Sequence, residues 1–332
     1  MDREWLRFGN TFCPYPFLHQ HIDIRKDKRL CCLSTEVIEQ DKGFNTDRYI
    51  SIRQSMLDNE RVSPCSFCYD AEDKKEISQR QKAIKDMQRH DELLMSQIAD
   101  HKSGKDIQPY WYDLRISNNC NLRCKMCSPD NSSSIAKAMG IDKSHLTNET
   151  EVDVNPDSIR LYLSGGEPFM IRKFVDVLER VENKDCEVIV NTNATIINDR
   201  MITALSKFKD VCITVSIDGY KETNAKVRIG SDWQSIDSNI DMFKSKGWSI
   251  HAQTVIQKDN VNHLVPLAEY IQSKGIKHWS CQEVIGEADL HWRSNESIDV
   301  ESLGKLLGLR LVKNNLQVHN MIKNILEFLT SK

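Results

Sequence analysis

The sequence predicts an α/β fold with a parallel sheet, preceded by a smaller cysteine-rich region. Two observations support this class. The chain of 332 residues is 39% hydrophobic, enough for a sizeable core, and from about residue 110 six strand-like segments alternate with helix-like ones. Successive strand–helix units imply right-handed crossovers between parallel strands. This periodicity is compatible with a partial barrel and with an open doubly wound sheet.

The elements can be placed in order along the chain. The first hundred residues contain few strand-like runs, with helices expected at 49–57 and within the polar stretch 72–100, before a linker at 101–106. Downstream, the expected strands are 112–117, 159–163, 187–191, 211–217, 250–256 and 276–284. The expected helices are 133–139, 171–181, 199–208, 235–246 and 264–273, with one or two more at 300–329.

This order predicts three domains. They are a cysteine-rich domain at 1–105, an α/β domain at 106–290 and a helical extension at 291–332. Within the α/β domain, alternation along 211–218 gives one polar and one aliphatic face. The polar face carries Cys212, Thr214, Ser216 and Asp218, and the aliphatic face carries Val211, Ile213, Val215 and Ile217. Helices should cover the aliphatic face, so the polar face should line the interior of a barrel.

The composition gives no indication of a nucleic-acid-binding or membrane protein. Lys plus Arg number 45 and Asp plus Glu number 48, so the formal charge of −3 lacks the basic excess that binds nucleic acid. No apolar run approaches the roughly 20 residues of a membrane helix. The charged start, from Met1 to Trp5, lacks the apolar core of a signal peptide. We therefore expect a soluble, cytoplasmic protein.

The chain has 11 cysteines, many for a reducing compartment where structural disulfides are disfavoured. Three of them, Cys120, Cys124 and Cys127, form a C-x3-C-x2-C loop where the first strand of the α/β region ends. Catalytic residues of βα folds gather at such strand ends. Three thiolates on a four-iron cluster would leave one iron open. The alternatives are a zinc site completed by a distant residue such as His145, or ordinary core cysteines.

A second motif, Gly165-Gly166-Glu167, follows the second strand, and glycines let a backbone approach a ligand closely. Together the two motifs resemble the signature of the radical S-adenosylmethionine (radical SAM) enzymes, over about residues 112–284. The resemblance implies a partial (βα)6 barrel and a [4Fe–4S] cluster that is held by the three cysteines and binds SAM at its open iron. In that family the Gly-Gly-Glu segment holds the methionine amino group.

The resemblance extends to three later loops. Asn193 lies in an Asn-Thr-Asn-Ala segment where the family often has Thr-Asn-Gly, and Ala194 departs from that pattern. Ser216 and Asp218 would lie near the ribose and methionine, although an Asp before glycine is also an ordinary turn residue. Arg228 would pair with the methionine carboxylate, which its planar guanidinium matches, or would be a surface charge.

The amino-terminal cysteines form a second candidate site. Cys13, Cys65, Cys68 and Cys32, with Cys31 as the alternative to Cys32, supply the four thiolates of a [4Fe–4S] cluster. This set resembles the SPASM or twitch domains of radical enzymes, which bind an auxiliary cluster but mostly follow the barrel. A four-cysteine zinc site would satisfy the same spacing.

Of the remaining cysteines, Cys281 lies near the end of the sixth strand. Facing the barrel interior, it could return a hydrogen atom to a substrate radical, whereas buried cysteine commonly serves as a small apolar residue.

The resemblance implies reductive cleavage of SAM to a 5′-deoxyadenosyl radical, which abstracts hydrogen from substrate. The partners are then a flavodoxin-like or ferredoxin-like electron donor and a substrate. Three possibilities remain open: peptide or protein modification or oxidation, small-molecule dehydrogenation or cofactor biosynthesis, and a non-catalytic iron–sulfur or zinc protein. Gly165-Gly166-Glu167 argues against the last.

Overall fold

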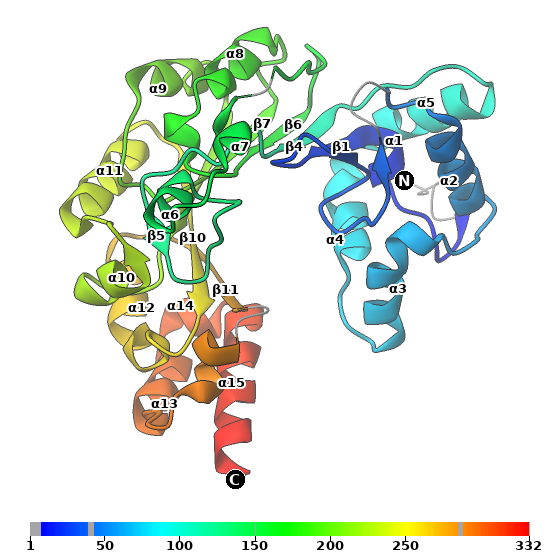
Figure 1. Ribbon diagram of the computed structural model, residues 1–332. Helices are drawn as coiled ribbons and strands as arrows, with labels where there is room; N and C mark the ends of the chain where they lie inside the picture. Colours follow the sequence, from blue (N-terminus) through cyan, green and yellow to red (C-terminus); the bar gives the residue numbers. More distant parts are fainter. Residues whose placement is uncertain (1–7, 39–42, 150, 285–287, 332) are drawn as a thin grey trace. The chain divides into compact units, whose positions relative to one another are not determined.

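A computed structural model describes residues 8–38, 43–149, 151–284 and 288–331. The chain divides into two compact units (Figure 1). The first comprises residues 1–116, 150–163 and 176–186, and the second comprises residues 117–149, 164–175 and 187–332. The three-domain division stays a prediction.

The first unit contains a mixed sheet. β4 (Trp111–Leu114) pairs in parallel with β6 (Arg160–Leu163) and with β1 (His19–Ile22). The short strands β2 (Lys28–Arg29) and β3 (Val37–Ile38) continue it in antiparallel order. The sequence did not indicate β1, because its residues His-Gln-His-Ile lack apolar alternation, yet all four are buried.

Helices of the first unit pack around a buried apolar core. They are α1 (Tyr15–Leu18), α2 (Asp47–Leu57), α3 (Ser66–Asp73), α4 (Gln79–Asp86) and α5 (Asp91–Lys102). The helices expected at 49–57 and within 72–100 are confirmed by α2, α4 and α5. Inside this core, the buried guanidinium of Arg53 donates hydrogen bonds to the carbonyl oxygens of Pro16 at 2.7 Å and Phe44 at 2.6 Å. It thereby fixes the segment before α2.

The second unit is built on four parallel strands in chain order. They are β7 (Glu187–Thr192), β8 (Asp210–Ser216), β10 (Ser249–Ile256) and β11 (His278–Glu283). Helices α9 (Asp199–Leu205), α11 (Trp233–Ser245) and α12 (Leu264–Ser273) connect or follow them (Figure 1). With β4 and β6, all six expected strands of the α/β region are present. The fold is mostly parallel α/β, consistent with a partial (βα)6 barrel, and the described strands form no closed barrel.

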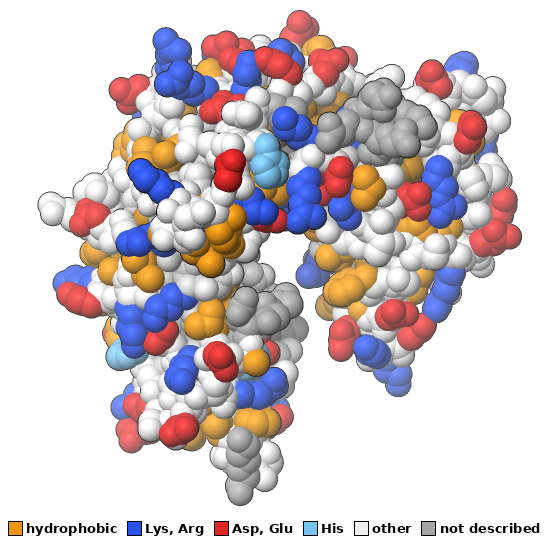
Figure 2. All heavy atoms as spheres, viewed as in Figure 1, with side chains coloured by type: hydrophobic (Ala, Val, Ile, Leu, Met, Phe, Trp, Pro, Cys, Tyr) orange, Lys and Arg blue, Asp and Glu red, His pale blue; other side chains and the backbone are white. Residues whose placement is uncertain are grey.

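The remaining elements are short, or lie near the carboxyl end. They are β5 (Arg123–Cys124), α6 (Ser133–Ala138), α7 (Ser144–Thr147), α8 (Lys173–Arg180), α10 (Glu222–Val227), β9 (Arg228–Ile229), α13 (Val300–Gly308), α14 (Arg310–Lys313) and α15 (Leu316–Thr330). The last three lie in the stretch 300–329, which is helical as expected but contains three helices where one or two were predicted. Within the described part of the chain, no helix has the length and apolar character needed to cross a membrane. Figure 2 shows acidic and basic side chains intermixed on the face in view.

The register of the second unit's strands separates two faces. Ser216 on β8 pairs with Gln253 on β10, which pairs with Ser280 on β11, so these three side chains share one face. Val215 and Ala252 lie on the other face and are fully buried, as the aliphatic face of a helix-covered strand should be. The alternation expected along 211–217 is therefore present.

Candidate functional site

The three-cysteine loop lies in the second unit, where serine side chains hold it. Ser132, the N-cap of α6, accepts a hydrogen bond from the amide of Ile135 and donates one to the carbonyl oxygen of Leu122 at 2.7 Å. Ser134 donates to the carbonyl oxygen of Cys120, also at 2.7 Å. The start of α6 thus fixes the backbone on which the first cysteine stands, a role that the serine run after the cysteines could have indicated.

A short ladder joins this loop to Arg228. β5 pairs with β9 so that Cys124 lies opposite Arg228. The Arg228 Nη1 lies 3.8 Å from the Cys124 Sγ and donates to it. Burial raises the pKa of Cys124, and Arg228 opposes the rise because its positive charge favours the thiolate. Arg228 therefore supplies a cation next to one of the three thiols.

Arg228 also pairs with Asp218, at 2.8 Å between Nε and Oδ2. Asp218 is fully buried, its Oδ1 accepts a hydrogen bond from the Val255 amide at 2.7 Å, and its carbonyl oxygen accepts one from Asn260. Burial raises the pKa of Asp218, while Arg228 opposes the rise. Two residues that the family resemblance assigned to SAM are thus paired with each other here.

The Gly165-Gly166-Glu167 segment packs tightly against the residues before Cys120. Gly166 has φ +37°, and a Cβ there would overlap the carbonyl oxygen of Asn119. The amide of Glu167 donates to that same oxygen at 2.7 Å. Only glycine fits between these two loops, so this contact explains the residue type at position 166.

The carboxylate of Glu167 is fully buried and holds the end of β7. It accepts hydrogen bonds from the Thr192 hydroxyl at 2.6 Å, the Asn193 amide at 2.8 Å and the Phe169 amide at 3.1 Å. Burial raises its pKa to about 7, although these hydrogen bonds oppose the rise. The Glu167 carboxylate therefore connects the loop after β6 to the end of β7 through hydrogen bonds.

Asn193 extends the network back to the cysteine loop, because its side-chain amide donates to the Asn121 side chain at 3.0 Å. The next residue, Ala194, has φ +57°, a left-handed conformation that glycine adopts without strain. This conformation accounts for the glycine that the family often has there. Ser216 donates to Asn191 at 3.0 Å on the polar face. Asn121, Asn191 and Thr192 lie in the motifs that the sequence indicated, but sequence reasoning assigned these three residues no role of their own.

A family model decides the classification of this region. Residues 114–271 match the model of the radical SAM superfamily. The match contains the cysteine loop, the Gly-Gly-Glu segment, Asp218 and Arg228.

Residues 114–271 form a radical SAM domain.

Curated relatives share only part of their length with this chain. An uncharacterized protein of Methanocaldococcus jannaschii is 27% identical over 49% of the chain and 59% of its own length. The tungsten-containing aldehyde ferredoxin oxidoreductase cofactor-modifying protein of Pyrococcus furiosus is 25% identical over 49% and 48%. GTP 3′,8-cyclase of Pectobacterium atrosepticum is 24% identical over 55% and 57%. The chain thus spans about half the length of the curated relatives it matches.

Solved structures resemble the chain loosely. Streptococcus suis SuiB bound to S-adenosylmethionine has a TM-score of 0.43 at 15% identity, covering 81% of this chain and 62% of its own. The anSMEcpe structure with bound AdoMet has a TM-score of 0.43 at 18% identity, covering 59% and 58%.

The match of residues 114–271 to the radical SAM superfamily implies a [4Fe–4S] cluster and SAM, and the residues present fit both. Burial is the main cause that raises the pKa of Cys120 to about 12 and that of Cys127 to about 11, and the neighbouring Cys124 thiol contributes to both shifts. Ser164, just before the glycines, has a buried hydroxyl that lacks a hydrogen-bond partner among the described residues. In the described ranges, no three His, Cys, Asp or Glu side chains converge on a point suited to one metal ion.

Cys281 does not share the polar face with Ser216. It pairs with Thr254 of β10, so it lies on the face of Val215 and Ala252, beside Trp279, whose indole donates to the Thr254 hydroxyl. It is 1% exposed, and burial strongly raises the pKa of its thiol. These surroundings are typical of a cysteine that serves as a small apolar core residue. The proposed function therefore does not use Cys281 as a hydrogen-atom donor.

In the first unit, four of the predicted amino-terminal ligands surround one small cavity. Cys13, Cys31, Cys65 and Cys68 line it together with Tyr15, Leu33, Phe67 and other residues. Burial, with a smaller contribution from neighbouring thiols, raises the pKa of Cys31 and that of Cys65 to about 12. Cys32 is exposed and does not line the cavity, although the sequence analysis chose it ahead of Cys31.

Proposed function

We propose that this chain is a radical SAM enzyme in which Cys120, Cys124 and Cys127 hold a [4Fe–4S] cluster that binds SAM. The observation that carries the proposal is the three-thiol loop, joined to Arg228 by the β5–β9 ladder and to the Gly-Gly-Glu segment by Asn119. When bound, the cluster supplies the electron that cleaves SAM to methionine and a 5′-deoxyadenosyl radical, which removes a hydrogen atom from substrate.

The chain's own groups bind and orient the reactants. The three thiolates bind iron, and Arg228 next to Cys124 offsets part of their negative charge. Gly165 and Gly166 have no Cβ, so a ligand can approach their backbone closely. The neighbouring Ser164 hydroxyl is free to hydrogen-bond a polar ligand. Asn193, Ser216, Asp218 and Arg228 are proposed to contact SAM, as the family pattern implies.

We assign the four thiols around the small cavity of the first unit to an auxiliary [4Fe–4S] cluster, with Cys31 as the fourth ligand. What supports this choice is that Cys13, Cys31, Cys65 and Cys68 line one cavity while Cys32 is exposed. Such a cluster would accept the second electron of a substrate oxidation. A four-thiolate zinc site is the alternative.

The favoured substrate class is a peptide or protein that is modified or oxidised. A small-molecule dehydrogenation or cofactor-biosynthesis reaction is the second candidate, supported by the match to the cofactor-modifying protein and the cyclase over half their lengths. The electron donor would be flavodoxin-like or ferredoxin-like.

Anaerobic reconstitution tests the SAM chemistry. The wild-type chain is loaded with iron and sulfide, then given SAM and dithionite, and 5′-deoxyadenosine is quantified. We expect it to form in the wild type and in Cys186→Ala, which removes a buried cysteine outside both sites, and not in a Cys120→Ala/Cys124→Ala/Cys127→Ala variant. Absence of 5′-deoxyadenosine from the wild type would contradict the proposal.

Metal analysis tests the auxiliary site. In the triple variant, we expect about four irons per chain. Adding Cys31→Ala should lower this number, whereas adding Cys32→Ala should leave it unchanged. Zinc in place of iron, or a larger loss from Cys32→Ala, would refute the assignment.

A further inference from the structure

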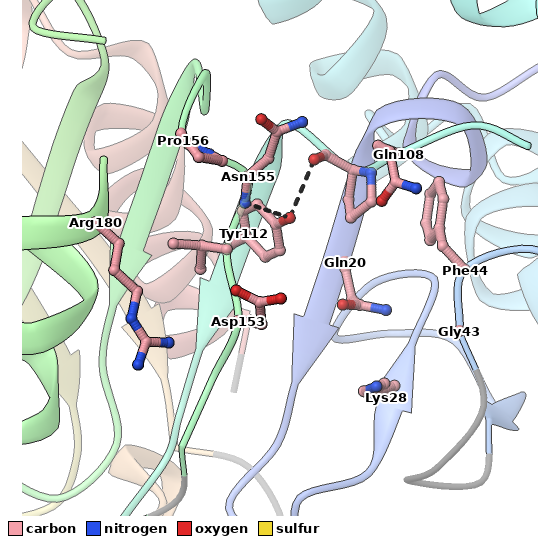
Figure 3. A pocket seen from close by; sticks show the side chains of 12 residues that line it. Gln20, Lys28, Gly43, Phe44, Gln108, Tyr112, Asp153, Asn155, Pro156 and Arg180 are labelled. Atoms are coloured by element: carbon pink, nitrogen blue, oxygen red, sulfur yellow. Dashed lines mark hydrogen bonds between the residues drawn. The ribbon is translucent and has the colours of Figure 1, made fainter. Parts of the chain in front are cut away.

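Two cavities of the first unit differ in how they treat charge. One is an open groove of about 700 Å³, whose lining includes the charged residues Lys28, Asp153 and Arg180 (Figure 3). Asp153 and Arg180 are exposed, so water and salt screen their charges. The other, the cysteine cavity, is lined by Cys13, Cys31, Cys65 and Cys68. Its wall contains a charge that is buried.

Arg80 supplies this charge. Of the described residues that line the cysteine cavity, it alone is an Arg, Lys, Asp or Glu. It is only 6% exposed, and a guanidinium stays protonated in proteins. The cavity therefore has a permanent positive charge in its wall, largely removed from water, where electrostatic interactions are stronger than at the surface.

Hydrogen bonds hold the Arg80 guanidinium in place. Its Nη1 donates to the carbonyl oxygen of Phe12 at 2.8 Å, directly before Cys13. Its Nε donates to the Glu72 carboxylate at 2.9 Å, and its Nη2 completes a bidentate ion pair with the same carboxylate. Ser78, the N-cap of α4, also donates to Glu72. The start of α4 and the ion pair thus fix the position of the charge together.

The charge of Arg80 acts on the thiols. Burial is the main cause that raises the pKa of Cys65 to about 12, and Arg80 opposes the rise because its positive charge favours the thiolate. The same field stabilises any further negative charge in the cavity. An iron–sulfur cluster gains one negative charge on reduction, and the charges and hydrogen bonds around a cluster set its reduction potential. A buried cation in the wall therefore favours the reduced form, and the Glu72 carboxylate opposes this effect.

We propose that Arg80 raises the reduction potential of the auxiliary cluster and that Glu72 limits the rise. The inference rests on the proposed function, in which the four thiols of the cysteine cavity hold this cluster. Arg80 binds no iron in this arrangement and acts through its charge alone. A higher potential favours the uptake of an electron, which is the role that the proposed function gives to the auxiliary cluster.

The test uses the full chain with the changes Cys120→Ala, Cys124→Ala and Cys127→Ala, so that iron is expected only at the auxiliary site. After anaerobic reconstitution with iron and sulfide, a redox titration with dithionite follows the EPR signal of the reduced cluster. We expect Arg80→Gln to lower the equilibrium constant for reduction about tenfold, a shift of about 59 mV for one electron. Glu72→Gln should raise this constant, and the double variant should lie between the two single variants.

Two further variants separate the charge of Arg80 from its packing. Arg80→Lys keeps the positive charge but not the planar fork, so we expect the constant to stay within about threefold of the parent value. Arg61→Gln is the matched control. It removes an exposed arginine whose ion pair with Asp73 lies outside the lining of the cysteine cavity, and it should leave the potential unchanged.

The iron content and the potential together decide the outcome. About four irons per chain with the parent potential in both Arg80→Gln and Glu72→Gln would overturn the inference and leave the auxiliary cluster standing. Shifts of the same sign in these two variants would also overturn it, because opposite charges must act in opposite directions. If Arg80→Gln fails to bind iron, the direction of the shift in Glu72→Gln decides. A parent chain without iron would refute the auxiliary cluster and the inference with it.

Discussion

At the residue scale, the structure explains why position 166 has no side chain. Its positive φ alone disfavours other residues, and the Asn119 carbonyl oxygen additionally occupies the place of a Cβ. That oxygen also accepts the amide hydrogen of Glu167, so it cannot move away freely. The second glycine of the Gly-Gly-Glu segment is therefore required by its contact with the loop that carries Cys120.

We expect Gly166→Ala to destabilise the protein by about 3 kcal/mol or more, because backbone strain and steric overlap act together. The matched control is Gly140→Ala. Gly140 also has positive φ, at +66°, but no atom lies within 4 Å of the place of its Cβ. It should cost about 1 kcal/mol. Urea unfolding of both variants gives the difference, and equal losses would show that Asn119 does not restrict position 166.

At the scale of elements, the start of α6 determines the backbone of the cysteine loop. Ser132 is both the N-cap of this helix and the donor to Leu122 between the first two cysteines. A short helix of this kind has little stability of its own. Its cap therefore stabilises the helix and the loop together.

Ser132→Ala should cost about 2 kcal/mol, since it removes a cap and leaves a buried carbonyl oxygen without its donor. The control Asp299→Ala removes the N-cap of α13, an exposed side chain that accepts a hydrogen bond from the Ser302 amide. We expect this variant to lose about 1 kcal/mol. Urea unfolding again provides the comparison. A loss no larger than that of the control would mean that the Leu122 contact contributes nothing to stability.

At the scale of the whole molecule, each unit contains a buried group whose titration affects stability. In the second unit, burial raises the pKa of Glu167 to about 7. In the first unit, burial lowers the pKa of His19 to about 4, although its ring nitrogen contacts the Leu30 carbonyl oxygen at 2.8 Å. The two shifts have opposite consequences for folding.

Glu167 binds its proton more tightly in the folded state, so its stabilisation is present below its unfolded pKa and is lost as pH rises through 7. His19 binds its proton less tightly in the folded state, so its contribution is present above its unfolded pKa and is lost as pH falls towards 4. Each amounts to roughly 3 kcal/mol at most, from about 1.4 kcal/mol per pKa unit.

We expect these opposing dependences to offset each other partly in the metal-free wild type. Urea unfolding between pH 4.5 and 7.5 should show stability rising with pH in Glu167→Gln and falling with pH in His19→Asn, which keeps a donor for Leu30. If either variant reproduced the wild-type profile, the corresponding residue would not titrate in this range. Each variant serves as the control for the other.

Much of the fold could be predicted because its signals are local. The six strands and the helices between them follow from the apolar periodicity of contiguous residues, and each is found within a few residues of its expected position. β1 could not be predicted, since its polar residues form a strand only because β4 lies beside them. β5 and β9 are two residues each and exist only as partners.

For the candidate site, the sequence by itself determined the groups of residues that are close in the chain, namely the three-cysteine loop and the Gly-Gly-Glu segment. These two motifs carry the resemblance to the radical SAM enzymes. Only the tertiary structure decided that Arg228 pairs with Asp218 and Cys124, that Cys31 lines the cavity, and that Cys281 faces away from Ser216. The physical reason is that strand register and burial set these relations. A shift of one residue in register turns a side chain to the opposite face of the sheet. Contacts between segments that are distant in the chain do not produce a repeating pattern in the sequence of either segment.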